Sequence, residues 1–162
     1  MLISVVTASD RCSKKLCEDK SGPLIFDLLS DIAEAAEYVV VPDEKDIIAA
    51  ELARLCDEVK SDIIFTTGGT GFAPRDITPE ATKAVIEKEV PGIPEAIRAK
   101  SLEITPKAML SRATAGIRGK TLIINLPGSP KAVRESLEIV KPVLGHAVET
   151  LSGDTQSCGG NY

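Results

Sequence analysis

Residues 62–80 read Asp-Ile-Ile-Phe-Thr-Thr-Gly-Gly-Thr-Gly-Phe-Ala-Pro-Arg-Asp-Ile-Thr-Pro-Glu, and the rest of the chain is organised around this stretch. Its apolar, β-branched residues 63–66 predict a buried strand. Three glycines and two threonines follow, and they cannot continue that strand. Thr78 and Pro79 then predict a helix start, with threonine as the N-cap and proline at the first helical position. The stretch therefore predicts a strand that leads through a polar glycine loop into a helix.

The glycine loop carries groups that can bind phosphate oxygens. Glycines have no Cβ, so their backbone N–H groups can approach a ligand closely, and threonine hydroxyls and an arginine fork add donors. Asp76 can hold the Mg²⁺ that usually accompanies a nucleotide. The spacing matches neither the Walker P-loop nor the dinucleotide fingerprint, so a tight turn without a ligand is the alternative on spacing alone. The predicted phosphate-binding residues are Thr67, Gly68, Gly69, Thr70, Gly71 and Arg75.

Length and composition predict one globular domain. The chain has 162 residues, of which 43% are hydrophobic and 27% are charged. We expect the domain to span residues 1–151 and a polar, flexible tail to occupy residues 152–162. The net charge of −5 and the scattered Lys and Arg residues argue against nucleic acid or an acidic membrane as partners. No apolar run approaches about 18 residues and no secretory signal is recognised, so we expect a cytoplasmic protein without a membrane span.

The four cysteines are candidate metal ligands or disulfide partners. Cys12 and Cys17 have four residues between them, but no second close pair completes a zinc set, and His146 lies far away in the sequence. We therefore expect neither a metal nor a disulfide role for the cysteines, Cys158 included. Cys56 falls on an apolar helical stripe and is expected in the core. His146 is expected to be structural or solvent-facing on its helix.

Strand and helix patterns alternate along the chain. Further strands are predicted at residues 2–7 and 37–41, and a hairpin at residues 115–118 and 120–126. Helices are predicted at residues 23–33, 46–60, 78–90 and 94–103, with Asp46 as one N-cap, and one or two more at residues 130–151, broken near Pro142. This order predicts a three-layer α/β fold, in which a mostly parallel central sheet has helices on both faces.

Loops at the carboxyl ends of parallel strands meet at one edge of a sheet, where open α/β folds bind ligands. Four loops are expected there, at residues 9–11, 43–44, 67–76 and 125–129. They offer glycine N–H groups, a helix start at Ser129, two arginines and several carboxylates, but no Ser-His-Asp set and no Cys-His pair. The arrangement suits a reaction between two phosphate-bearing partners, in which the protein supplies positioning and charge neutralisation through Mg²⁺.

Several motifs, in one order along the chain, match a known family. The longest are residues 66–82, with Gly-Gly-Thr-Gly-Phe-Ala-Pro-Arg-Asp, and residues 116–129, which end in Leu-Pro-Gly-Ser. Shorter matches are Ser-Asp-Arg at 9–11, Val-Pro-Asp-Glu at 41–44 and Met-Leu-Ser-Arg at 109–112. Over nearly its whole length the chain resembles the molybdopterin adenylyltransferases of the MogA type, also seen in the G domains of gephyrin and its plant counterpart.

The resemblance implies a reaction in molybdenum cofactor biosynthesis. In this reaction the terminal phosphate of molybdopterin attacks the α-phosphate of Mg-ATP, giving adenylyl-molybdopterin and pyrophosphate. Asp43 and Asp76 match the family's essential aspartates and are implied in catalysis and in holding Mg²⁺, while the glycine loop is implied in ATP binding. The residues implied in molybdopterin binding are Ser9, Asp10, Ser111, Asn125, Pro127, Gly128 and Ser129.

Structural roles are alternatives for three of these residues. Asp43 could merely begin a turn, Arg75 could pair with a neighbouring acid, and Ser129 could only cap a helix. The family further implies a homo-oligomer, either a trimer or a hexamer as in related MoaB-type proteins. The chain lacks the molybdenum-inserting domain of the gephyrin-type fusions, so transfer of the product to a separate insertase is also implied.

Two other functions are compatible with the motifs. A catalytically silent MoaB-type carrier or scaffold would bind molybdopterin and leave ATP uncleaved. A nucleotide-processing enzyme of the CinA type shares the Gly-Gly-Thr-Gly loop but fits the Leu-Pro-Gly-Ser helix start less well. The pair formed by Asp43 and Asp76 favours the adenylyltransferase, because a pure binder would not need two acids to position a metal.

Overall fold

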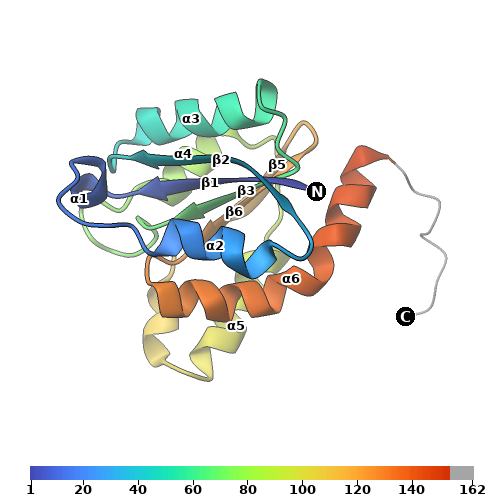
Figure 1. Ribbon diagram of the computed structural model, residues 1–162. Helices are drawn as coiled ribbons and strands as arrows, with labels where there is room; N and C mark the ends of the chain where they lie inside the picture. The colour runs from blue at the N-terminus through green and yellow to red at the C-terminus, as the bar shows by residue number, and fades with distance from the viewer. Residues whose placement is uncertain (154–162) are drawn as a thin grey trace.

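A six-stranded sheet runs through the middle of the computed structural model, which describes residues 1–153 (Figure 1). The strands are β1 (Leu2–Ala8), β2 (Glu34–Val41), β3 (Ile63–Thr67), β4 (Lys88–Glu89), β5 (Ala115–Arg118) and β6 (Thr121–Leu126). Their order in the sheet is β2-β1-β3-β6-β5-β4. The first four in this order are parallel to one another, while β5 pairs antiparallel with both β6 and β4. The predicted three-layer fold with a mostly parallel sheet is confirmed.

Helices cover both faces of this sheet (Figure 1). They are α1 (Asp10–Ser13), α2 (Ser21–Leu29), α3 (Lys45–Asp57), α4 (Thr78–Val85), α5 (Gly92–Leu102), the 3₁₀ helix η1 (Pro106–Leu110) and α6 (Pro130–Ser152). Helices α3 and α4 lie on one face, and α2, α5 and α6 lie on the other. Among residues 1–153, no helix combines the length and the apolar character that a membrane crossing requires.

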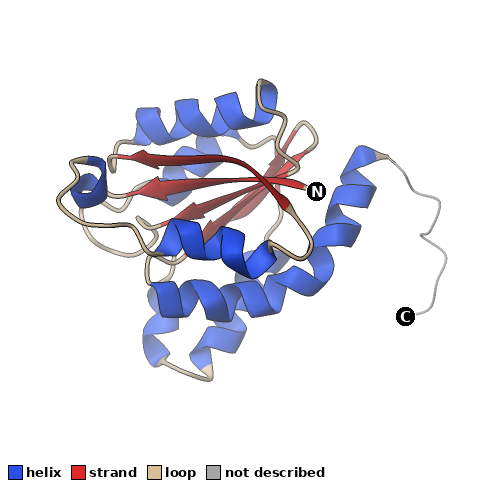
Figure 2. Cartoon of the chain, in the orientation of Figure 1, coloured by secondary structure: helices blue, strands red, loops and turns tan. Residues whose placement is uncertain are grey.

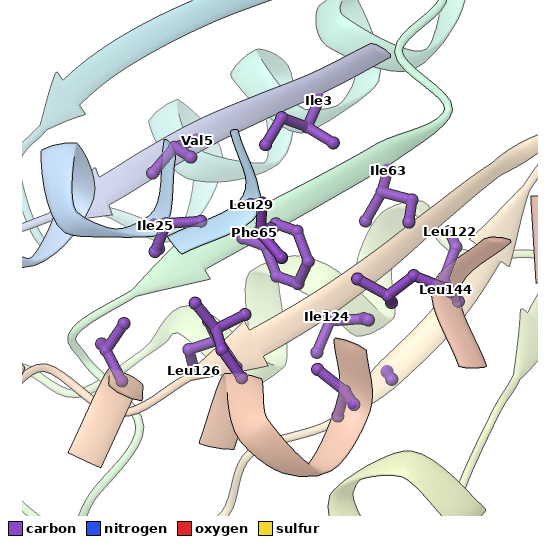
Figure 3. Packing of buried hydrophobic residues seen from close by; sticks show 14 of the residues in the cluster. Ile3, Val5, Ile25, Leu29, Ile63, Phe65, Leu122, Ile124, Leu126 and Leu144 are labelled. Carbon is purple, nitrogen blue, oxygen red and sulfur yellow. The ribbon is translucent and has the colours of Figure 1, made fainter. Parts of the chain in front are cut away.

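The core is divided by the sheet because successive strand side chains point to opposite faces. In β3, Ile63 and Phe65 pack against α2 and α6, whereas Ile64 packs against α3 and α4. Strand β6 alternates in the same way, with Ile123 on the second side. Figure 3 shows the larger cluster, in which Phe65 lies among Ile25, Leu29 and Ile124. Each fully buried aliphatic or aromatic side chain of this kind contributes about 1.5–3 kcal/mol.

Several predicted element boundaries were wrong. The helix predicted at residues 23–33 is Ser21–Leu29, and the strand predicted at residues 37–41 begins at Glu34. The helix predicted at residues 78–90 ends at Val85, because Ile86 adopts an extended backbone and the chain pairs with β5 as β4. Helix α3 begins at Lys45 with Glu44 at the N-cap, so Asp46 lies in the first turn and does not cap the helix. Ile77 holds the N-cap position of α4, and Thr78 is its first residue. Tertiary pairing and loop geometry displaced these ends from the positions that local residue preferences favour.

Helix α6 is continuous through Pro142, although the chain visibly changes direction along it (Figure 1). A proline in a helix interior removes one backbone hydrogen bond and causes such kinks. The helix runs to Ser152 and ends at Gly153, whose φ is +89°. Helix α6 therefore extends one residue past the predicted domain end at residue 151. The rest of the predicted tail, with Cys158, lies outside the described residues.

Candidate active site

The loops predicted to converge do meet at one edge of the sheet. Figure 2 shows the arrowheads of β1, β2 and β3 pointing to the same end of the molecule. The N–H of Ser9, after β1, donates to the carbonyl of Val41 at the end of β2. A Cβ on Gly128, after β6, would lie 3.3 Å from the Cα of Gly68, after β3. Ser21 Oγ also donates to the carbonyl of Gly128 at 2.8 Å, so this edge brings together residues that are 107 positions apart.

Three carboxylates gather at this edge. The N–H of Asp10 donates to Asp43 Oδ2 at 2.8 Å, and the N–H of Asp43 donates to Asp10 Oδ1 at 3.2 Å. Burial raises the pKa of Asp43, and the negative charges of Asp10 and Asp76 raise it further. The Asp10 carboxylate has a lowered pKa because it accepts a side-chain hydrogen bond from Arg75. The site therefore concentrates negative charge around Asp43.

Arg75 pairs with acids on two loops. Its Nε and Nη2 atoms each lie 3.0 Å from an oxygen of Asp10, and Nη2 lies 2.7 Å from Glu44 Oε1. Arg75 therefore pairs with neighbouring acids, which was the structural alternative given for this arginine. The Arg75 side chain is 54% exposed, and exposed ion pairs contribute little to stability. Its guanidinium can consequently exchange a carboxylate for a phosphate at low cost.

Asp76 is held by its own loop. Its Oδ2 accepts a hydrogen bond from the N–H of Ala73 at 3.0 Å, and the N–H of Asp76 donates to the carbonyl of Ala73 at 2.9 Å. A Cβ on Gly71 would lie 2.9 Å from Asp76 Oδ2, so the glycine leaves room for this carboxylate. The turn directs the Asp76 carboxylate back over the glycine loop.

The glycine loop follows a path that only glycine permits at two positions. Gly68 and Gly69 have φ values of +91° and +62°, which L side chains rarely adopt. A Cβ on Gly68 would lie 2.4 Å from the carbonyl oxygen of Ala8, and one on Gly69 would lie 2.4 Å from Thr78 Oγ1. Thr67 Oγ1 donates to the carbonyl of Pro127 at 2.8 Å. The loop backbone is thus packed between the ends of β1 and β6.

Two cavities flank the glycine loop. One, of about 280 Å³, is mostly apolar and reaches from Thr70 and Gly71 to Ser111 and Pro127, beneath helices α5 and α6. The other, of about 340 Å³, is more polar and includes Gly68 together with the residues Thr7, Ser9, Asp19, Ser21, Thr67 and Gly128. The apolar cavity is bordered by Thr70, Gly71 and Pro127 and the polar one by Thr67, Gly68 and Gly128, so the two lie on either side of the glycine loop.

Asn125 and Ser129, which were predicted to contact molybdopterin, make hydrogen bonds within the protein. The buried Asn125 amide donates to Thr66 Oγ1 and Thr82 Oγ1 at 2.9 and 2.8 Å, and its Oδ1 accepts from the N–H of Thr114 at 3.2 Å. Asn125 still forms part of the apolar cavity wall, as does half-buried Ser111. Exposed Ser129 caps α6 through a bond from the N–H of Ala132, as the capping alternative expected.

Asp19 was missed in the sequence, although it lies in the polar cavity. Its carboxylate accepts hydrogen bonds from Thr7 Oγ1 and Tyr38 Oη at 2.6 and 2.7 Å, and from the N–H groups of Ser21 and Gly22. Burial acts to raise the pKa of Asp19, but these bonds outweigh it and the pKa is lowered. The run Asp19-Lys20-Ser21 before a helix was the available signal, because aspartate satisfies free N–H groups at helix starts.

Cys12 and Cys17 form a disulfide, so the expectation that the cysteines have no such role was wrong. Helix α1 ends at Ser13, and the chain then reverses at Lys15, whose φ is +57°. This reversal places the two Cα atoms 4.8 Å apart, which sequence spacing alone does not reveal. Cys12 borders the polar cavity, and Cys56 is buried in the core as expected. His146 is solvent-facing on α6, also as expected.

The acids of the site suit Mg²⁺ better than a metal that needs a full protein cage. In the described part of the chain, no group of three or more His, Cys, Asp or Glu residues is arranged to hold a metal ion. Mg²⁺ is usually bound through one or two carboxylates together with water and substrate phosphates. The raised pKa of Asp43, caused by burial and by Asp10 and Asp76, reflects an excess of negative charge that a cation would relieve.

Comparison with known proteins agrees with this geometry. The family model "Probable molybdopterin binding domain" matches residues 4–146. The chain is 50% identical to the molybdopterin adenylyltransferase of Helicobacter pylori J99, over 94% of this chain and 88% of that protein. It is 43% identical to the molybdopterin adenylyltransferase of Escherichia coli K12, over 90% and 76% of the two chains.

A solved structure shares the fold at similar coverage. The molybdopterin biosynthesis enzyme MoaB from Thermus thermophilus superimposes with a TM-score of 0.89 and 46% identity, covering 94% of this chain and 96% of that one. Sequence, fold and the glycine loop with its carboxylates therefore agree, and the chain belongs to the molybdopterin-binding family of molybdenum cofactor biosynthesis.

Proposed function

We propose that the chain is a molybdopterin adenylyltransferase, which transfers AMP from Mg-ATP to the terminal phosphate of molybdopterin. The relatives that carry this name are 43–50% identical to the chain. The observation that best supports the same activity here is the pair of cavities on either side of the glycine loop, whose Gly69 and Gly71 lie against the Asp43 and Asp76 carboxylates. Such an arrangement can hold two phosphate-bearing molecules in line, and positioning of this kind provides much of the catalysis in phosphoryl-type transfers.

The transfer needs no nucleophile from the protein. An oxygen of the molybdopterin phosphate forms a bond to the α-phosphorus of ATP, and the bond between that phosphorus and the oxygen bridging to the β-phosphate breaks. Pyrophosphate leaves with the electron pair. Mg²⁺, when bound, neutralises charge on the phosphates of ATP. The protein's own residues bind the two substrates, align the phosphates and exclude water.

We assign Asp43 and Asp76 to holding Mg²⁺ and orienting the nucleotide. They approach the site from the loop after β2 and from the turn that follows the glycine loop, and each is fixed by a backbone hydrogen bond. Arg75 is assigned to the ATP phosphates after exchange of its exposed carboxylate partners. The N–H groups of the glycine loop are assigned to the same phosphates, since they lie between the two cavities.

The apolar cavity is the better candidate for the pterin, because a flat ring system gains most from apolar walls with a few polar groups. In this assignment Ser111 and Pro127 contact molybdopterin from the cavity wall, and Asn125 shapes that wall through its internal bonds. Ser9 and Gly128 border the polar cavity, which this assignment leaves for the nucleotide. We further propose a cytoplasmic homo-oligomer that passes its product to a separate molybdenum insertase.

Pyrophosphate release from Mg-ATP, measured with and without molybdopterin, tests the activity. Release that requires molybdopterin, and that fails in folded Asp43→Ala and Asp76→Ala variants, is the expected result. Circular dichroism and molybdopterin binding serve as controls for the variants. If the wild-type protein binds molybdopterin and releases no pyrophosphate at any Mg²⁺ concentration, the activity is excluded and the MoaB-type carrier takes its place.

A further inference from the structure

Arg112 connects three points of the loop that carries Arg75 and Asp76 to the helix that follows it. It lies between η1 and β5, more than 30 positions along the chain from that loop. Its N–H donates to the carbonyl of Thr70 at 2.9 Å. Its guanidinium donates through Nε to the carbonyl of Gly71 at 2.7 Å, through Nη2 to the carbonyl of Asp76 at 2.8 Å, and through Nη1 to Glu80. A single side chain therefore spans both ends of the turn.

The other supports of the turn are local or exposed. Ala73, Asp76 and Thr78 make hydrogen bonds within residues 69–78, and Arg75 pairs at the surface with Asp10 and Glu44. A planar guanidinium presents donors in three fixed directions, which matches two carbonyls and one carboxylate arranged around it. A lysine ammonium has the same charge but cannot reach all three acceptors from one position. The shape of Arg112, as well as its charge, determines the path of the turn.

Glu80 completes the arrangement from helix α4. Its Oε1 accepts from Arg112, while its Oε2 is buried and finds no hydrogen-bond partner among residues 1–153. Loss of the guanidinium would leave this carboxylate without a counter-charge in a partly buried place, which favours displacement of the helix start and of the turn before it. Asp76 lies directly on that turn and would move with it.

We propose that Arg112 is a positioning residue for adenylyl transfer. It holds the Asp76 carboxylate and the glycine loop at a fixed position relative to the neighbouring cavity wall. The guanidinium donors of Arg112 are directed at the carbonyls of Gly71 and Asp76 and at Glu80, so it acts through the turn that carries Asp76 and not by contact with substrate. Its neighbour Ser111 lines the apolar cavity, so the backbone at residues 111–112 joins the pterin side of the site to the turn that carries Asp76. This inference rests on the proposed adenylyltransferase activity.

Arg118 provides a matched control. It donates two hydrogen bonds to Asp57 and one to the carbonyl of Val85, at the end of the β5–β6 hairpin remote from the site. The side chains of Arg112 and Arg118 are similarly exposed, at 32% and 29%. Replacing either arginine by lysine keeps the charge and removes the fork. Only the change at Arg112 should affect the turn.

The test compares Arg112→Lys with Arg118→Lys in two assays. Hydrogen exchange of residues 70–78 does not depend on activity, and we expect it to be about tenfold faster in R112K alone. For pyrophosphate release we expect R112K to lower kcat about 100-fold, the loss typical of a 1 Å misplacement, with both KM values within about twofold of wild type. R118K should retain the wild-type kcat.

The two assays separate the possible failures. Unchanged exchange in R112K overturns the positioning role, whatever the kcat. Faster exchange with an unchanged kcat overturns the link between the turn and transfer, and a raised KM with an unchanged kcat overturns it in favour of direct substrate binding. A wild-type protein that releases no pyrophosphate refutes the proposed function instead, while exchange still reports whether Arg112 holds the turn.

Discussion

Asp10 and Asp43 hold each other through paired backbone-to-carboxylate hydrogen bonds. Each residue donates its N–H to the other's side chain, at 2.8 and 3.2 Å, so the loops that follow β1 and β2 are locked together. Arg75 binds the Asp10 carboxylate and relieves its charge, whereas Asp43 has no arginine bonded to it and is half-buried among acids. The site therefore places the Asp43 carboxyl where the fold disfavours its ionised form, as functional sites commonly do.

Asp43→Asn is expected to unfold at the same temperature as the wild type or higher at pH 7, while adenylyl transfer is lost. Burial, together with Asp10 and Asp76, raises the pKa of Asp43 above its ordinary value of 3.8, so the folded state disfavours the ionised form. The wild type consequently loses stability relative to the variant as the pH rises from 3.8 through the raised pKa. Thermal unfolding at pH 7 and at about pH 3, where the carboxyl is protonated in both states, measures this difference.

The pH trend provides the control for Asp43→Asn. The stability advantage of the variant should be fully present at pH 7 and absent at the acid pH. A variant that is much less stable than the wild type at pH 7 would mean that the ionised Asp43 stabilises the fold, contrary to the raised pKa.

Gly69→Ala is expected to destabilise the protein and to impair transfer more than Gly119→Ala. Both glycines have similar positive φ values, +62° and +56°, so both substitutions carry the strain of a left-handed backbone, about 1–2 kcal/mol. A Cβ at Gly69 would also lie 2.4 Å from Thr78 Oγ1 and 3.2 Å from Asp43 Oδ1, whereas one at Gly119 meets nothing within 4 Å. Urea unfolding and pyrophosphate release on both variants measure the difference, and equal losses would show that contact with Asp43 and Thr78 is unimportant.

Cys17→Ser is expected to lower the free energy of unfolding by about 2 kcal/mol, the loop-closure value for so short a disulfide loop. A thiol reductant should cause a similar loss in the wild type and none in the variant, because the Cys12–Cys17 bond is already absent there. Urea unfolding with and without reductant measures both effects. A reductant effect of equal size in the variant would show that the sensitivity to reductant does not come from the Cys12–Cys17 bond.

Burial raises the pKa of the Cys56 thiol to about 11, so Cys56 should stay unreactive toward alkylating agents in the folded protein.

Much of this architecture was predictable because it depends on local pattern. Apolar, β-branched runs such as residues 63–66 marked the strands, and helical spacing marked Ile48, Leu52 and Leu55, which are all buried. Boundaries were less predictable where pairing with a distant strand decided them. Residues 88–89 are Lys and Glu, with no strand pattern of their own, and they are extended only because β5 lies beside them.

By itself, the sequence determined the order of the longer strands and helices, the glycine loop, the acids Asp43 and Asp76, and the family resemblance, but not α1 or β4. Only the tertiary structure decided that Asp10 and Asp43 bond to each other, that Arg112 holds the Asp76 turn, and that Cys12 reaches Cys17. It also directed the Asn125 amide to Thr66 and Thr82. The physical reason is that side-chain periodicity reports which face of an element is buried, whereas hydrogen bonds between loops depend on how the sheet places distant segments side by side.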